Sequence, residues 1–136
     1  MRVGIEIAPG ELVDRITILQ IKANKISDQT KLTHVINELD TLTKSSAHMQ
    51  ECLKAQGQSD KFHELNIHTD AIYKANERVW DVLQRQRELE RAGEFGDEFV
   101  KVSLEVYHVN DERAEAKRKI NELFGTDIAE MKFYPK

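Results

Sequence analysis

Apolar side chains recur at helical spacing over nearly the whole chain between its two prolines, Pro9 and Pro135. Since proline is the residue that breaks a helix interior, nothing between these two positions forbids long helices. The spacing and the capping residues predict four helices, over about 11–26, from a cap at Ser27 or Asp28 onward, over about 60–91 and over about 97–124. Glycine-containing breaks separate the later helices, and Gly125 ends the last one.

The two ends of the chain show a different pattern. Val3, Ile5 and Ile7 alternate with polar or small residues, which is typical of a short half-buried strand. A second, less regular alternation follows near the other end, at Ile128, Met131, Phe133 and Tyr134. Because a two-stranded ribbon is marginal alone, it would have to lie on the helices. We therefore expect one mainly α domain over 1–136, an antiparallel bundle of about four helices with a small two-stranded β element from the termini.

The fourth predicted helix carries an apolar stripe that charged residues interrupt. At 100° per residue, its apolar side chains gather within an arc of roughly 80°. They are Phe99, Val102, Val106, Val109, Ile120 and Phe124. Arg113 and Lys117 fall within the same arc, and Asn110 lies beside it. Because an unpaired buried charge is strongly unfavourable, these groups need partners or must line a cavity.

Two interpretations of the inward charges stay open. In the first, carboxylates neutralise Arg113 and Lys117, and the result is only a specified core. The candidate partners are Asp14, Glu77 and Glu90. Long Arg and Lys stems also extend along apolar surfaces while their charges reach water. In the second interpretation, the first, third and fourth helices enclose a pocket whose cations hold a phosphate or carboxylate.

The pocket interpretation defines a candidate ligand site made of cations, amides, aromatic rings and polar groups of the first helix. Its members are Asp14, Arg15, Thr17, Lys22, Asn76, Trp80, Arg87, Tyr107, Asn110, Arg113 and Lys117. Arg113, Lys117 and Arg87 would bind the anion, and the two asparagines would orient it. Trp80 or Tyr107 would stack on a ring of the ligand.

Composition narrows the classes of function. Twenty Lys and Arg against 24 Asp and Glu give a net charge of −4, so non-specific nucleic-acid binding is not expected. Cys52 is the only cysteine, which suits a reducing compartment and excludes an intrachain disulfide. No segment reads as a signal peptide or membrane span. We expect a soluble cytoplasmic protein, in the host cytoplasm if phage-encoded. Helices of about thirty residues, roughly 45 Å long, indicate a homo-oligomer.

Catalytic signatures are weak. The five histidines show no zinc-binding spacing, no ladder of carboxylates suits Mg²⁺, and no phosphate-binding glycine loop is present. We therefore predict neither a metal nor a cofactor, and favour a protein that is not an enzyme. If the chain were an enzyme, the groups to inspect would be Glu11, Asp14 and Tyr107.

Three blocks of the sequence are PGELVDRITILQIK (residues 9–22), NERVW (76–80) and NDERAEAKRKIN (110–121). Together they resemble an uncharacterised family of small helical bacterial and phage proteins, a domain of unknown function. The resemblance covers most of the chain except the second helix. The matching positions include Gly10, Glu11, Asp14, Thr17, Lys22, Asn76, Trp80, Tyr107, Asn110, Asp111, Arg113, Lys117 and Asn121. The resemblance implies a shared site and no particular reaction; such proteins are often encoded near glycosyltransferases for surface polysaccharides.

Two functions follow as hypotheses. The first is a non-enzymatic protein that holds a small anionic ligand, a nucleotide or sugar nucleotide, between its helices. If the chain is phage-borne, such a site would suit the sequestration of a nucleotide signal of host immunity. The alternative is a homo-oligomeric helical scaffold or adaptor for a protein partner such as a glycosyltransferase.

Overall fold

The computed structural model describes residues 1–126, and the predicted helices are present. They are α1 (Pro9–Lys25), α2 (Gln29–Ala55), α3 (Phe62–Arg91), which follows the short 3₁₀ turn η1 (Ser59–Lys61), and α4 (Asp97–Phe124). Their ends lie within about two residues of the predicted ones. The mainly helical class is therefore confirmed.

Capping chemistry explains two of these boundaries. The Asp28 carboxylate accepts a hydrogen bond from the backbone N–H of Lys31 at 2.9 Å, and so satisfies one of the free donors at the start of α2. Gly125 follows α4 with a φ of 66°, a left-handed conformation that glycine adopts without strain. Both residues were predicted from the sequence as helix boundaries.

The predicted two-stranded β element is not found in the part of the chain that the structure describes. Residues 1–8 form no strand, although their apolar and polar residues alternate. Alternation makes a strand only where another strand accepts its backbone hydrogen bonds, and no such neighbour lies beside this segment within residues 1–126. The second predicted strand, with Ile128 and Phe133, lies outside the described residues.

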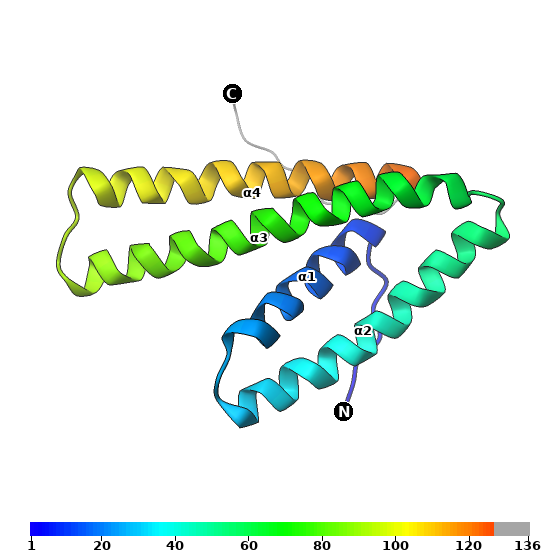
Figure 1. Ribbon diagram of the computed structural model, residues 1–136, viewed down its shortest axis with the longest axis horizontal. Coiled ribbons are helices and arrows are strands. Elements are labelled where there is room, and N and C mark those ends of the chain that lie inside the picture. The colour runs from blue at the N-terminus through cyan, green and yellow to red at the C-terminus, as the bar shows by residue number, and fades with distance from the viewer. Residues whose placement is uncertain (127–136) are drawn as a thin grey trace.

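The helices form two antiparallel hairpins instead of one compact four-helix bundle (Figure 1). Helices α3 and α4 run side by side over their full length, whereas α1 lies against only one half of that hairpin and α2 packs mainly on α1. This half contains the start of α3 and the end of α4. The other half, toward the turn at residues 92–96, projects beyond α1 (Figure 1).

The core lies where the four helices meet. It is made of Val13, Leu53, Leu65, Ile72, Ala116 and Ile120. Ile72 and Ile120 are completely buried, so the halves of α3 and α4 nearest α1 are the best packed. The apolar side chains of α2 are only partly covered. Leu53 is the one buried residue among them and Ile36 is 43% exposed, because α2 packs mainly on the short α1.

Helices α1 and α4 approach each other closely at Gly10, in the first turn of α1. Its backbone N–H donates to the side-chain oxygen of Asn121 on α4 at 2.8 Å. A Cβ atom at position 10 would overlap the backbone carbonyl of Lys117 and lie 2.9 Å from the Asn121 oxygen. The absence of a side chain at Gly10 therefore allows α1 to lie directly on α4.

We expect Gly10→Ala to lower the free energy of unfolding by about 1–3 kcal/mol, because the added methyl group forces α1 away from α4. Urea unfolding monitored by circular dichroism measures the change. Gly96→Ala is the matched control, since a Cβ at position 96 meets no atom within 4 Å. Equal stability of the two variants would contradict the close contact.

Candidate functional site

The centre of the candidate site is the carboxylate of Asp14 on α1, which is 1% exposed. Arg113 on α4 binds it with two hydrogen bonds, from Nε to Oδ1 at 2.7 Å and from Nη2 to Oδ2 at 2.5 Å. Asn76 on α3 donates to the same Oδ1 at 2.9 Å. One buried charge therefore joins three helices through a bidentate ion pair and an amide.

Neighbouring polar groups extend this cluster. The Thr17 hydroxyl donates to the Asp14 backbone carbonyl at 2.8 Å and accepts from Asn76 Nδ2 at 2.9 Å. On the other side, Arg113 Nη1 donates to Asn110 Oδ1 at 3.3 Å. No buried side-chain nitrogen or oxygen within residues 1–126 lacks a hydrogen-bond partner. The cluster is thus a satisfied network, the arrangement that makes buried polar groups tolerable.

Lys117 is the second inward cation of α4, and it is buried. Its Nζ lies 2.7 Å from Glu11 Oε2 and 3.9 Å from Asp14 Oδ2. Glu11 also accepts from Arg15 Nε at 3.2 Å. Two carboxylates of α1 therefore face two cations of α4, and the inner cluster is close to electrically neutral.

Both carboxyls of α1 are held ionised. Burial raises the pKa of Asp14, but the hydrogen bonds from Arg113 and Asn76 and the nearby positive charges outweigh it and hold the pKa below its usual value. Burial acts in the same direction on Glu11, and the bond to Lys117 again outweighs it, so the pKa of Glu11 is also lowered. The ion pairs are therefore intact at neutral pH.

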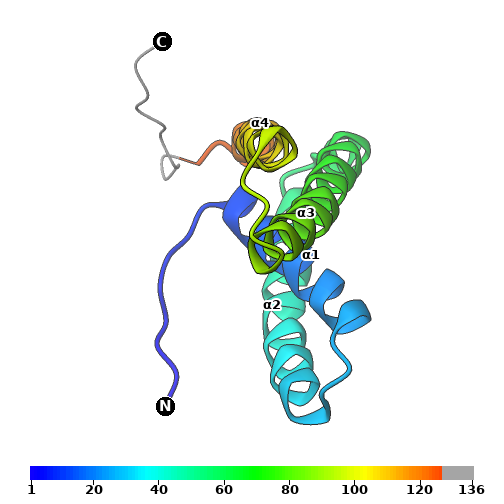
Figure 2. The same cartoon turned by 90° about the vertical axis from the view of Figure 1, so that its left-hand side faces the viewer.

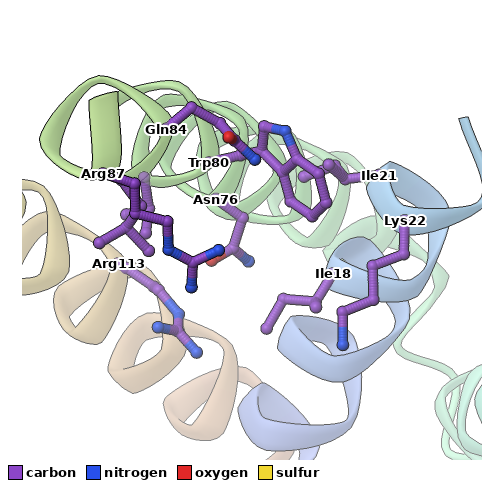
Figure 3. Close-up of a pocket in the computed structure, with 10 residues that line it drawn as sticks. Ile18, Ile21, Lys22, Asn76, Trp80, Gln84, Arg87 and Arg113 are labelled. Atoms are coloured by element: carbon purple, nitrogen blue, oxygen red, sulfur yellow. The ribbon is translucent and has the colours of Figure 1, made fainter. Parts of the chain in front are cut away.

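A pocket of about 270 Å³ lies beside this network, in the angle where α1 diverges from α3 (Figure 3). Its described lining residues come from three helices. They are Ile18, Ile21 and Lys22 of α1, Asn76, Val79, Trp80, Leu83, Gln84 and Arg87 of α3, and Arg113 of α4. Asn76 and Arg113 belong to both the network and the pocket wall.

The charges around the pocket are all positive. Lys22, Arg87 and Arg113 line it, and no carboxylate is among its described lining residues. Arg113 is neutralised by Asp14, whereas Lys22 and Arg87 form no ion pair within the described residues 1–126. Figure 3 shows Lys22 on the α1 side and Arg87 on the α3 side. The pocket therefore has uncompensated positive charge on two of its walls.

The predicted site residues divide into three groups. Five of them line the pocket, namely Lys22, Asn76, Trp80, Arg87 and Arg113. The network holds Asp14, Thr17, Asn110 and Lys117 behind it. Two lie away from it, because Arg15 is exposed and bonds to Glu11, and Tyr107 is 53% exposed beside His108. Tyr107 is thus no wall of this pocket.

The candidate ligand site predicted from the sequence does not include three contributors, although Glu11 and Asn121 are among the positions of the family resemblance. Glu11 neutralises Lys117, Asn121 binds the Gly10 backbone, and Gln84 lines the pocket. Glu11 had a detectable signal, since it precedes the buried Asp14 by nearly one helical turn and shares its face. Gln84 had none, because an exposed glutamine on a long helix is ordinary.

Comparison with known proteins finds no matching family model, curated protein or solved structure. The family resemblance of the three sequence blocks therefore stays a prediction. Within residues 1–126, no group of three or more His, Cys, Asp or Glu side chains is placed to hold a metal ion. No helix in the same range is long and apolar enough to cross a membrane.

We expect Arg113→Ala to lower the free energy of unfolding by about 3 kcal/mol, because it leaves the buried Asp14 carboxylate without its charge partner. Chemical unfolding at pH 7 measures the loss. The control is Arg118→Ala on the same helix, which removes exposed pairs with Glu115 and Glu122 and should change little. Similar values for both variants would show that Asp14 does not depend on Arg113.

The lowered pKa values of Asp14 and Glu11 predict that the stability of the protein is sensitive to acid. A carboxyl whose pKa is depressed by folding contributes stability above its unfolded pKa, and this contribution is lost as the pH falls. The usual values are 3.8 for Asp14 and 4.5 for Glu11. The free energy of unfolding should therefore fall as the pH drops below about 5.

The Asp14→Asn variant isolates this effect, because asparagine does not titrate. Its unfolding free energy should be lower at pH 7 and should depend less steeply on pH between about 5 and 3. Glu51→Gln is the control, since Glu51 is exposed on α2 and forms no ion pair within the described residues 1–126. An unchanged slope in Asp14→Asn would contradict the assignment.

Proposed function

We propose that this protein binds a small anionic, phosphate-bearing ligand of the nucleotide or sugar-nucleotide class in the pocket between α1, α3 and α4. The observation that carries the proposal is the charge of the lining. A chain with a net charge of −4 surrounds this pocket with three cations and no described carboxylate. Such a local excess of positive charge favours anions through charge-assisted hydrogen bonds.

The remaining lining residues suit the organic part of such a ligand. Trp80 is the only tryptophan of the chain, and Ile18 and Ile21 of α1 line the same pocket (Figure 3). An indole beside aliphatic side chains is a surface on which a base or sugar ring can pack. Asn76 and Gln84 add amide groups that orient a ligand by hydrogen bonds. The wall therefore combines apolar area with a few polar groups.

The size of the pocket limits the ligand. Its volume of about 270 Å³ lies just below the usual range for small-molecule sites, roughly 300–1,000 Å³. We infer a ligand of mononucleotide size whose ring lies against Trp80 and whose phosphates lie at the open edge, near Lys22 and Arg87. In this arrangement Arg113 is a wall of the pocket, held in place by Asp14, and Lys117 supports α1 through Glu11.

We propose binding without chemical conversion. The described lining consists of aliphatic, aromatic, amide and cationic side chains, with no His, Cys, Ser or carboxylate. General acid–base and nucleophilic catalysis depend mostly on such groups. If the chain is phage-borne, sequestration of a nucleotide signal is the use that this chemistry suits. Measured turnover of a bound nucleotide would contradict the proposal.

A second candidate function is the scaffold for a protein partner such as a glycosyltransferase. It is favoured by three exposed apolar residues on the projecting half of α4, Val100, Leu104 and Tyr107, spaced so that they share one face. The same ligand test separates the two functions. Co-purification of a protein that depends on Leu104 and not on Arg87 would favour the scaffold.

The proposal predicts that Arg87→Ala and Lys22→Ala each weaken nucleotide binding roughly tenfold, because each removes a charge-assisted hydrogen bond to phosphate. Fluorescence of Trp80 measures binding directly, since the ligand would cover the only indole. The titration uses a panel of mononucleotides, dinucleotides and nucleotide sugars. Native mass spectrometry of the purified protein tests for a ligand that is already bound.

Arg91→Ala is the matched control, because Arg91 is exposed on the same helix and does not line the pocket. Arg91→Ala should bind the nucleotide as the unchanged protein does. The pocket variants Arg87→Ala and Lys22→Ala should keep the unfolding free energy of the unchanged protein. If no compound of the panel changes the fluorescence and no extra mass is found, the nucleotide proposal is wrong. Equal weakening by Arg91→Ala would place the binding outside this pocket.

A further inference from the structure

The backbone of residues 1–7, before α1, has no hydrogen-bond partner in the described chain. The backbone of residues 1–7 runs as one extended trace set apart from the helices, as Figure 2 shows. Val3 is 77% exposed and Ile5 is 65% exposed. No backbone hydrogen bond reaches residues 1–7 from elsewhere in residues 1–126. The segment therefore presents unused N–H and C=O groups together with exposed apolar side chains, as an unpaired edge strand does.

The sequence of this segment is symmetric about Gly4. Arg2 and Glu6 stand at equal distances on either side, and so do Val3 and Ile5. In an antiparallel pair of strands centred on Gly4, Arg2 of one copy lies opposite Glu6 of the other. Val3 then lies opposite Ile5 of the other copy. Both ion pairs form on one face of the ribbon and the apolar pairs form on the other.

We propose that residues 2–6 pair with the same residues of a second copy of this chain, as an antiparallel two-stranded ribbon centred on Gly4. The ribbon uses the free backbone groups of both segments and brings the exposed Val3 and Ile5 side chains of both copies together. It is an isologous contact, so it closes at a dimer. This dimer does not depend on the proposed ligand pocket.

The charges and the apolar side chains favour this antiparallel register over a parallel pairing and over a register shifted by one residue. Parallel pairing in register places Arg2 against Arg2 and Glu6 against Glu6, and like charges directly opposite each other destabilise a sheet. A slip of one residue moves the apolar side chains of one strand to the polar face of the other. The antiparallel register centred on Gly4 avoids both the pairs of like charges and the mismatch of apolar and polar faces.

The segment is also anchored in a way that favours pairing. Ala8 at its end is buried at the start of α1, and Arg2 Nη1 donates to Thr41 Oγ1 of α2 at 3.3 Å. The chain is thus held at two points, and pairing has less conformational entropy to remove than in a free tail. A two-stranded ribbon is still marginal, so the dimer should depend on concentration.

The test is a charge swap, read by sedimentation velocity from low to high micromolar protein without an N-terminal tag. The unchanged chain should form a dimer. Arg2→Glu alone and Glu6→Arg alone each place two like-charged pairs in the ribbon, and should raise the dimer dissociation constant roughly tenfold or more. The double variant restores both ion pairs in reversed order and should recover most of the affinity that the single variants lose, although it lacks the bond from Arg2 to Thr41.

A mixture of the two single variants tests the charge pairing directly. A copy with Arg2→Glu and a copy with Glu6→Arg are complementary at both positions, so the equimolar mixture should form heterodimers although each variant alone is mainly monomeric. Circular dichroism of all variants should show unchanged helix content, because the segment lies outside the core. A chain that is monomeric throughout the range, or single variants that dimerise like the unchanged chain, would overturn the proposal.

Cross-linking tests the register. In a Cys52→Ser background, Gly4→Cys places two cysteines opposite each other at about 4.5–5.5 Å between Cα atoms, within reach of a disulfide. A Cβ at position 4 meets no atom within 4 Å in the chain itself. Gly4→Cys should form a covalent dimer rapidly, and Val3→Cys should cross-link faster with Ile5→Cys than with itself. If Val3→Cys cross-linked faster with itself than with Ile5→Cys, this register would be excluded.

Discussion

The fold depends on how the carboxylate of Asp14 is satisfied inside the protein. An ionised carboxylate with 1% exposure is strongly unfavourable unless charge and hydrogen bonds replace its water. Arg113 from α4 and Asn76 from α3 supply both. Because a bidentate guanidinium tolerates little displacement, these bonds fix the distance and rotation of α1 relative to the long hairpin. Gly10 allows the close contact with α4 that this geometry needs.

The same constraint explains why the structure is open elsewhere. The network and the apolar core hold α1 and α2 on one half of the α3–α4 hairpin, and α1 is only 17 residues long. Beyond that half, no helix of the described residues 1–126 covers the hairpin (Figure 1). Side chains on the two sides of the angle between α1 and α3 line the pocket. The pocket is thus the space left where the short α1 leaves the long α3.

Much of the helical architecture was predictable, because apolar spacing, caps and glycines are local signals. Asp28 and Gly125 marked helix ends, and the helical wheel of α4 correctly placed Lys117 inward. The prediction of a strand at residues 3–7 was wrong, because a strand requires a partner strand that a local sequence pattern does not reveal. The sequence offered three candidate partners for Arg113. A helical wheel shows which way a side chain points, but it does not show which neighbouring helix lies on that side. The divergence of the hairpins, which creates the pocket, has no local signal at all.

The network and the pocket share residues, and this changes how the two interpretations of the inward charges are separated. Arg113 and Asn76 stabilise Asp14 and also form pocket wall, so replacing either one alters stability and binding together. Lys117 is paired with Glu11 and lies behind the wall. The network therefore fits the structural interpretation without excluding the ligand, because its charges are balanced among themselves. Only Lys22 and Arg87 bring positive charge to the pocket without an ion pair in the described chain. A function that uses this pocket must act through them, and the network serves it by holding the walls at a fixed distance.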